Sequence, residues 1–333
     1  MKDIAQDLGL SAITVSKVLR NHPDISEETR QRVLRRVDEL DYRPNELARG
    51  LATGRSYLVG LIVPGLLHSF FAEVAMGLSA VIGPKGYSLI VASSEERQEI
   101  EQEEIRKLLA RRLDALVIAS SGSGTELFER MSKQSQPYVL IDRQFPALNA
   151  NFVGIDDMRA GLIATKHLYE IGRRRIAHIA GRVNSTGQGR LDGYRMALQE
   201  LGVPYRDEYV VHGAFVDTHT TEQGYAAMNT LLRLANPPDA VFCHNDPLAI
   251  GAMNAIFDAG LDIPKDIAMI GAGNLHFNSS LRVPLSSVDQ QSAKLGEQAG
   301  ELILDILDPK KNNGVHRVIL EPSVVVRAST KID

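Results

Sequence analysis

The stretch that divides this chain reads Arg43-Pro44-Asn45-Glu46-Leu47-Ala48-Arg49-Gly50-Leu51-Ala52. It separates a short helix-rich head from a long body in which strand-like and helix-like runs alternate. Pro44 suits the first position of a helix, but an isolated helix of fewer than about 12–15 residues is marginal in water. Gly50 costs such a helix about a further 1 kcal/mol. We therefore expect residues 44–57 to contain a hinge helix that needs a partner to fold; the alternative is a flexible linker.

The composition is that of an ordinary globular protein with more than one domain. The chain has 333 residues, of which 44% are apolar and 23% charged, and domains of 100–150 residues are the most common. Its apolar runs are too short to span a bilayer, and no signal segment opens it, so we expect a cytoplasmic protein without membrane contact. Cys243 is the only cysteine, which excludes an internal disulfide and a cysteine-based zinc site.

Charge alone does not indicate a nucleic-acid partner. The net charge is −4, and residues 1–57 carry 10 Lys/Arg against 9 Asp/Glu. Any DNA contact must therefore depend on where the charges of the head are placed.

The head contains the pattern of a helix-turn-helix. Gly9 ends a first helix, and Ser11 is a good N-cap for a second helix. A third helix follows, capped by Ser26, with a buried stripe of Val33, Val37 and Leu40. Two short helices joined by a glycine-containing turn favour DNA binding through the second helix.

The outward face of the second helix is the candidate DNA-reading surface. Lys17 can reach a guanine edge or a phosphate, and small apolar side chains can touch thymine methyl groups. The candidate DNA-binding residues of the head are Ser11, Ala12, Ile13, Thr14, Ser16, Lys17 and Asn21. The alternative is a solvated helix face on a small helical domain.

The body alternates strands and helices at the spacing of βαβ units. The expected strands are Leu58–Pro64, Tyr87–Ala92, Ala115–Ala119, Tyr138–Ile141, Ile176–Ala180, Tyr209–Val211, Ala240–Cys243 and Ile267–Ile270. The expected helices are Phe71–Ile82, Glu96–Leu109, Ala160–Ile171, Arg190–Leu201, Thr221–Leu234, Pro247–Ala259 and Lys294–Leu307. Two sets of strands imply two lobes, each with a parallel sheet covered by helices, and the strand-rich end Val315–Arg327 is expected to complete both sheets.

Ligands of open α/β sheets bind beyond the carboxyl ends of the strands. The residues that follow the expected strands combine aromatic rings with carboxylate, guanidinium and amide groups, which suits a small polar ligand. The candidate ligand-binding residues are Phe70, Phe71, Asp142, Asn184, Thr186, Arg190, Phe215, Asn245, Asn274 and Gln290. Singly, an Asn or Asp after a strand more often caps a helix or turn.

The head resembles that of LacI/GalR-type transcription regulators. The resemblance rests on Lys2-Asp3-Ile4-Ala5, on residues 10–19, on Ile25-Ser26-Glu27-Glu28-Thr29-Arg30 and on Tyr42-Arg43-Pro44-Asn45. It implies that Ala12, Ile13 and Lys17 read bases. It also implies that two hinge helices pair in the minor groove, where Leu51 wedges between base steps; we place Arg49 on the same DNA-binding surface. No Ser or Thr precedes Lys2, so we expect the first helix to lack the N-cap usual in this family.

The body resembles the effector domain of the same family, which is similar to periplasmic sugar-binding proteins. The matching segments are Val63-Pro64 with Ser69-Phe70-Phe71-Ala72-Glu73, residues 179–194 and residues 243–251. The resemblance implies that Arg190 forks to ligand hydroxyls or a carboxylate. Where the family shows Gly-Phe/Tyr-Asp-Asp, this chain has Gly271-Ala272-Gly273-Asn274. The loss of one carboxylate favours a ligand that is less hydroxylated, larger or itself acidic.

The expected fold is therefore α/β. A two-lobed, periplasmic-binding-protein-like body with parallel sheets follows a small all-α helix-turn-helix domain. We expect the DNA-binding domain at 1–43, the hinge at 44–57 and the effector-binding and dimerisation domain at 58–333. The first lobe is expected at about 58–154 plus 289–316, and the second at about 155–288 plus 317–330.

Other chemistry finds little support. The sequence contains no P-loop, dinucleotide fingerprint or metal-ligand spacing, so we expect no enzyme, no cofactor and no metal. Three tempting features have simpler interpretations. The serine- and glycine-rich run 120–124 is interpreted as a turn, His244 as a packed side chain and the glutamate-rich run Glu95–Glu104 as a solvated helix face.

The sequence thus predicts a ligand-responsive repressor of carbohydrate or related metabolite genes. Its expected partners are a palindromic double-stranded DNA operator, a second copy of the chain and a small effector (a sugar, sugar derivative or similar polar metabolite). No leucine heptad follows the body, so we expect a dimer and not a tetramer. The alternative is a solute-binding protein with the same body and no DNA role.

Overall fold

A computed structural model describes residues 1–19, 22–42, 50, 53–122, 124–212, 219–311 and 314–331. The chain forms two compact units, Met1–Tyr57 and Leu58–Asp333. Four predicted site residues, Asn21, Arg49, Leu51 and Phe215, lie outside the described residues, as does most of the predicted hinge helix.

The head is a three-helix unit, as predicted. Its helices are α1 (Lys2–Leu8), α2 (Ala12–Leu19) and α3 (Glu27–Glu39). Gly9 ends α1 in the left-handed region at φ 66°, and Met1 gives that helix no side-chain cap. The Ser11 hydroxyl accepts the Thr14 amide at 3.0 Å, so the expected cap of α2 is present. The core of this unit is formed by Ile4, Ala5, Val15, Val18 and Val33.

One part of the predicted head core is wrong. Leu40 is 44% exposed because α3 ends at Glu39 and Leu40 has left the helical backbone conformation. The helical spacing that aligned it with Val33 and Val37 therefore no longer applies.

The first lobe of the body is built on a six-stranded parallel sheet in the order β11-β5-β4-β3-β1-β2. Its strands are β1 (Leu58–Val63), β2 (Ser88–Ser93), β3 (Ala115–Ile118), β4 (Tyr138–Ile141), β5 (Phe152–Ile155) and β11 (Arg317–Leu320). The four strands predicted for this lobe are present as β1 to β4. Strands β1, β3 and β4 lie inside the sheet and are apolar throughout because both of their faces are covered, whereas β2 forms an edge and is partly exposed.

The second lobe repeats this plan in the order β12-β10-β9-β8-β6-β7. Its strands are β6 (Ile176–Ala180), β7 (Val210–His212), β8 (Ala240–Cys243), β9 (Ala268–Ala272), β10 (Ser286–Asp289) and β12 (Ser323–Val325). Only β12 runs antiparallel to its neighbour.

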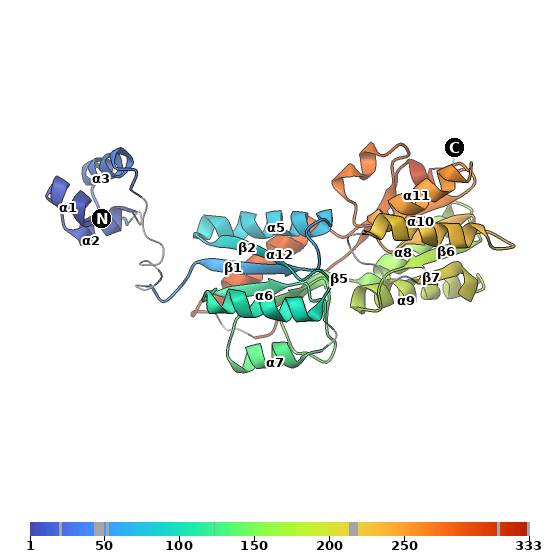
Figure 1. The fold of residues 1–333 in the computed structure, drawn as a ribbon, viewed down its shortest axis with the longest axis horizontal. Helices are drawn as coiled ribbons and strands as arrows, with labels where there is room; N and C mark the ends of the chain where they lie inside the picture. Colours follow the sequence, from blue (N-terminus) through green and yellow to red (C-terminus); the bar gives the residue numbers. More distant parts are fainter. Residues whose placement is uncertain are drawn as a thin grey trace. The chain divides into compact units, whose positions relative to one another are not determined.

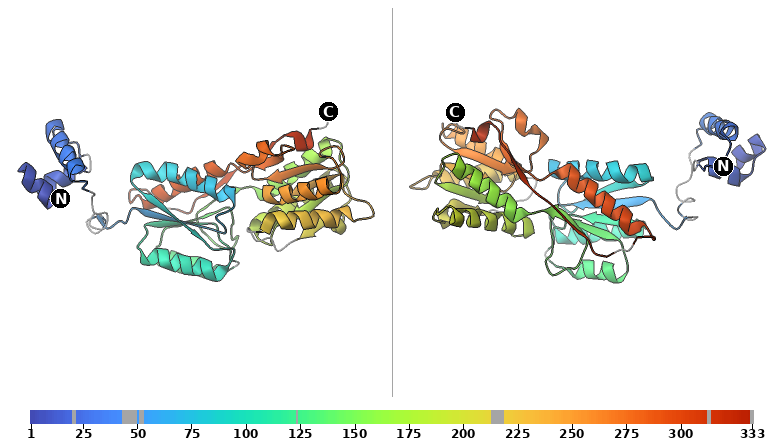
Figure 2. Two further views of the ribbon diagram at one scale, coloured as in Figure 1. Left: turned by 45° about the horizontal axis from the view of Figure 1, so that its top comes forward. Right: turned by 180° about the vertical axis from the view of Figure 1, so that it is seen from behind.

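Helices cover both faces of each sheet (Figures 1 and 2). In the first lobe, α5 (Ser69–Ile82) packs on α12 (Ser292–Leu307) on one face, while α6 (Gln98–Ala110) covers the other. The short α7 (Glu126–Lys133) lies beyond α6 in Figure 1. In the second lobe, α8 (Asp157–Glu170) pairs with α9 (Ser185–Glu200), and α10 (Thr220–Leu232) pairs with α11 (Asp246–Asp258).

The expected boundary between the lobes needs one correction. Residues 317–320 were assigned to the second lobe, whereas β11 pairs with β5 in the first sheet. The chain therefore passes between the lobes near residues 156, 290 and 322. Among the described residues, no helix is long and apolar enough to cross a membrane.

Candidate ligand-binding site between the lobes

Seven of the predicted ligand-binding residues line one small cavity between the lobes. They are Phe70, Phe71, Asp142, Thr186, Arg190, Asn245 and Gln290, and His68, Arg143 and His244 complete the lining. Because strands β1, β4, β6 and β8 all end toward the partner lobe, the residues that follow them meet there. The cavity measures about 60 Å³, which leaves little room for a ligand in this conformation.

Arg190 lies at the centre of this cavity and is only 3% exposed. It lies inside α9, which begins at Ser185 and not at Arg190 as predicted. Its Nε donates to Asp157 at 2.9 Å, its Nη1 to the His244 carbonyl at 2.6 Å and its Nη2 to Gln290 at 3.0 Å. Burial raises the pKa of Asp157 to about 7, although Arg190 opposes the shift. Asp157 and Gln290 flank two of the interlobe crossings, so Arg190 ties the second lobe to the chain segments that cross between the lobes.

Aromatic rings form the first-lobe wall of the cavity. Phe70 and Phe71 lie in the first turn of α5, with ring centroids 5.0 Å apart in an edge-to-face arrangement. The centroid of the His68 ring lies 6.2 Å from that of Phe70 and 5.8 Å from that of Phe71. Rings in this arrangement offer an apolar surface on which a sugar ring or a planar ligand packs.

Two histidines that were not predicted to bind ligand, His68 and His244, add neutral polar groups to the cavity. Burial lowers the pKa of His68 to about 4 and that of His244 well below its usual value. The Nδ1 atoms of both rings are buried and have no hydrogen-bond partner within the described part of the chain. A neutral imidazole can donate or accept one hydrogen bond at each nitrogen, so a ligand hydroxyl would satisfy either atom.

The three predicted asparagines serve different purposes. Asn184 caps α9 by accepting the Gly187 amide, and Asn245 caps α11 by accepting the Leu248 amide. Asn245 still lines the small cavity, whereas Asn184 lines its larger neighbour. Asn274 lines neither; its Oδ1 accepts a bond from Arg327 at 2.6 Å.

The Asp246 carboxylate lies close to Gly273, the position at which the family has an aspartate. The Asp246 side chain is fully buried and accepts hydrogen bonds from Ser287, from the Leu275 amide and from Asn278. A Cβ at Gly273 would lie 3.0 Å from Asp246 Oδ2. Gly273 also has φ 134°, a backbone conformation that glycine adopts without strain, so the geometry of this loop suits glycine better than aspartate.

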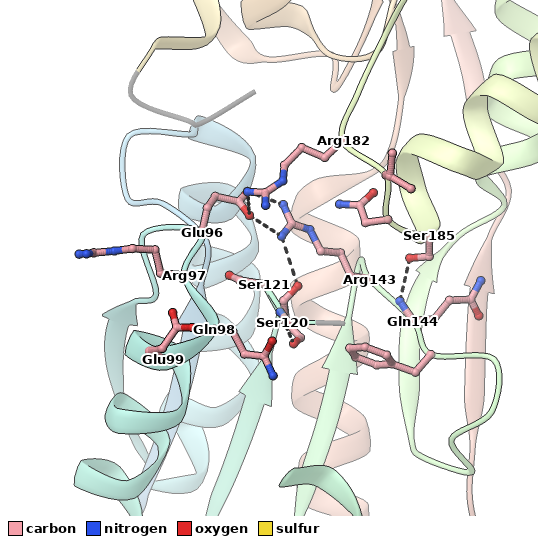
Figure 3. Close-up of a pocket in the computed structure, with 14 residues that line it drawn as sticks. Glu96, Arg97, Gln98, Glu99, Ser120, Ser121, Arg143, Gln144, Arg182 and Ser185 are labelled. Carbon is pink, nitrogen blue, oxygen red and sulfur yellow. Dashed lines mark hydrogen bonds and ion pairs between the residues drawn. The ribbon is translucent and has the colours of Figure 1, made fainter. Parts of the chain in front are cut away.

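A larger, polar cavity adjoins the small one and shares Arg143 with it. It measures about 540 Å³, within the range of small-molecule sites. Both lobes line this cavity (Figure 3): the first contributes residues 96–99, 120–122 and 143–145, and the second contributes residues 182–185. The predicted solvated face of Glu95–Glu104 is therefore wrong at two positions, since Glu96 and Glu101 are 8% and 2% exposed.

Two charged residues of this larger cavity, Glu96 and Arg182, were not predicted for the site, whereas Arg143 was expected near it as the residue after Asp142. The two arginines carried a usable signal, because Arg143 follows β4 and Arg182 follows β6 by two residues or fewer. Glu96 carried none, since its partners lie 47 and 86 residues away in sequence. Among the described residues, no group of three or more His, Cys, Asp or Glu side chains is placed to hold a metal ion.

Comparison with known proteins gives two family matches. Residues 1–45 match the model for bacterial regulatory proteins of the lacI family, and residues 165–330 match the periplasmic binding protein-like domain. The chain is 30% identical to the catabolite control protein A of Priestia megaterium over 99% of this chain and 98% of that protein. It is 34% identical, with the same coverage, to the ribose operon repressor of Haemophilus influenzae.

The similar solved structures are also transcription regulators. A complex of the transcriptional regulator CelR with cellobiose superimposes with a TM-score of 0.75, at 30% identity and 98% coverage of both chains. A LacI family regulator from Enterococcus faecium with bound ribose gives a TM-score of 0.72 at 25% identity, over 82% of this chain and 98% of that one.

Proposed function

This chain belongs to the lacI family of bacterial regulatory proteins, and on that premise we propose that it is a ligand-responsive repressor. As a homodimer it binds a near-palindromic operator, and it takes a small polar metabolite between the lobes of its body. The observation that carries the proposal is the convergence of aromatic and polar residues from both lobes on one cavity, in a chain that also bears a DNA-binding head.

The head supports the DNA-binding part of the proposal. The α2 face that is expected to read bases is turned away from the head core, and Ile13 is 69% exposed. Lys17 lies on the same face with its side chain 36% exposed. An exposed isoleucine of this kind suits contact with thymine methyl groups. Ala12 lies beside Ile13, and we assign it to the same base contacts. Ser11, Thr14 and Ser16 carry hydroxyl groups, and we assign them to phosphate and sugar contacts.

We assign the hinge role to residues 44–57, with Arg49 and Leu51 as its DNA contacts. Closure of the lobes changes the separation of two such hinges in a dimer, and this biases their folding on DNA. The alternative of a solute-binding protein without a DNA role has no place for a lacI-type head.

A carbohydrate or a related compound is the effector class that the cavity suits best. Two similar structures, both of transcription regulators, contain cellobiose and ribose. In this chain, the Phe70–Phe71 wall, the free imidazole nitrogens and Thr186 offer a sugar ring both an apolar face and hydroxyl partners.

The test is DNA binding by the full chain in the presence and absence of a panel of sugars, sugar acids, sugar phosphates and nucleobases. We expect at least one compound to change operator affinity by tenfold or more. Arg190→Lys keeps the charge but cannot make all three hydrogen bonds of the guanidinium, so it should lose most of the response and retain operator binding without effector. An operator affinity that no compound changes would contradict the proposal.

A further inference from the structure

The larger cavity between the lobes contains an arginine whose hydrogen-bonding capacity is mostly unused. The Arg182 side chain is 37% exposed, and its Nη1 donates to Glu96 at 3.0 Å. A guanidinium has five N–H donors, and this single bond is the one that Arg182 makes to the described residues. Its other donors are therefore available to a ligand in a cavity of about 540 Å³.

A buried carboxylate holds this arginine in place. The Glu96 side chain is 4% exposed and binds Arg143 through both oxygens, at 2.7 and 3.0 Å. One of the same oxygens accepts the bond from Arg182. We call Glu96, Arg143 and Arg182 the cleft ion cluster. Figure 3 shows both guanidinium groups turned toward Glu96, while Arg97 points away from them.

The cleft ion cluster joins the two lobes. Glu96 and Arg143 follow β2 and β4 of the first lobe, and Arg182 follows β6 of the second. Glu96 has φ 57°, a left-handed conformation that a residue with a side chain adopts at some cost. Tertiary contacts thus maintain a locally unfavourable backbone that presents a carboxylate to two arginines.

The surroundings of the cluster are polar, and Glu99 is the other acidic residue in the lining of this cavity. Ser120, Ser121 and Gln98 line the same cavity. Glu101, the other buried acid nearby, is engaged by the Ser120 hydroxyl and the Ser121 amide. The nearest further carboxylate to Arg143 is Asp142, at 3.8 Å from its Nε. Glu96 is therefore the one described carboxylate in contact with Arg182, and it occupies the position that a ligand oxyanion would take.

We propose that the larger cavity is an anion subsite, which takes a carboxylate or phosphate group of the effector on Arg182 and Arg143 in competition with Glu96. The proposal rests on the proposed function, since the rest of the effector occupies the neighbouring aromatic cavity. The two cavities share Arg143, so one molecule with a polar ring and an acidic end reaches both once the lobes separate enough to enlarge the aromatic cavity. Fork-shaped guanidinium groups bind such oxyanions through paired, charge-assisted hydrogen bonds.

The experiment is isothermal titration of the full chain, without DNA, with matched neutral and acidic compounds. The pairs are glucose with gluconate, ribose with ribose 5-phosphate and cellobiose with cellobionate, and inorganic phosphate serves as the smallest probe. The carboxylate and phosphate arms identify which oxyanion is preferred. We expect at least one acidic member to bind about 10- to 100-fold tighter than its neutral partner, the range of a charge-assisted hydrogen bond.

Two variants locate the effect. Arg182→Gln should abolish the preference for the acid and change neutral binding by less than threefold, whereas Glu96→Gln should strengthen acid binding severalfold because the internal competitor loses its charge. Arg206 and Glu208 form an exposed ion pair in the second lobe, 3.6 Å apart. Arg206→Gln and Glu208→Gln therefore serve as charge-matched controls and should alter neither affinity.

Equal binding of acid and neutral partners, or an acid preference that survives Arg182→Gln, would overturn the anion subsite. Absence of binding by every probe to both the native chain and Glu96→Gln would overturn it as well. These outcomes are separable from the repressor proposal, which fails when DNA binding or its response to effectors is absent. A chain that binds acids but not operator DNA would keep the subsite and lose the repressor.

Discussion

Lys17, the residue expected to reach a base edge or a phosphate, is held by a carboxylate within the head. Its ammonium lies 2.6 Å from Asp24 Oδ2, and His22 Nδ1 lies 2.6 Å from Oδ1 of the same carboxylate. Lys17 is the main cause of a lowered pKa of Asp24, through their hydrogen bond. The cation on the candidate DNA-reading face is therefore partly neutralised within the head itself.

Asp24→Asn should release this cation. We expect DNA affinity at low salt to rise severalfold, and the slope of log affinity against log salt to steepen by up to about 0.9, the value for one additional phosphate contact. Fluorescence anisotropy across a salt series measures both quantities. Asp38→Asn makes the same charge change on α3 and is the control; an equal effect of the two variants would show that only net charge matters.

At the scale of the elements, three helix pairs of the body approach closely through reciprocal glycines. A Cβ at Gly77 of α5 would lie 2.0 Å from the Ala293 carbonyl oxygen of α12, and one at Gly296 of α12 would lie 2.1 Å from that of Val74. Gly161 with Gly193 and Gly224 with Gly251 repeat the arrangement in the pairs α8–α9 and α10–α11. These contacts fix the distance between the helices that cover each sheet.

Gly77→Ala should therefore destabilise the body. The new methyl group meets backbone that cannot rotate away, so the helices must separate, and overpacking of this kind costs about 1–3 kcal/mol. Urea denaturation followed by circular dichroism measures the loss. Ser79→Ala, at an exposed position of the same helix, is the control and should change stability by less than about 0.5 kcal/mol. A Gly77→Ala protein as stable as the control would contradict the close approach.

The elements that could be predicted from the sequence are those whose own residues are continuously apolar or follow a helical apolar pattern. Strands such as β3 and β8 are continuous apolar runs buried along their whole length. Local sequence patterns do not reveal β10, because its Ser286 and Ser287 are polar and yet fully buried. These serines are satisfied by Ser329 and Asp246, each more than 40 residues away, and no periodicity reveals such partners.

The same limit applies to the candidate site. Parallel strands bring the residues after them to one edge, so Phe71, Asp142 and Thr186 were predictable from the order of strands alone. The cleft ion cluster was not predictable in this way. Glu96 stands in a charged run and is expected to be solvated, and only the fold brings Arg143 and Arg182, which follow β4 and β6, beside it.

At the scale of the whole body, the lobes are held together by polar contacts on two sides of the cleft. Arg182 binds Glu96 at 3.0 Å, the Gln144 amide donates to the Ser185 hydroxyl at 3.0 Å, and His276 Nδ1 lies 3.7 Å from Glu73. Each contact joins a first-lobe residue to a second-lobe residue and must break when the cleft opens. An effector that substitutes for one of them shifts the balance between open and closed lobes by its differential affinity for the two states.

The central proposal is that the protein binds DNA as a two-fold symmetric dimer and that its body regulates this binding. The most direct measurement selects duplexes from a random pool with the full chain and determines the mass of the complex formed on the enriched sequence. The account predicts two half-sites related by two-fold symmetry, bound by two copies of the chain. A pool without enrichment, or a single asymmetric site bound by one copy, would contradict it.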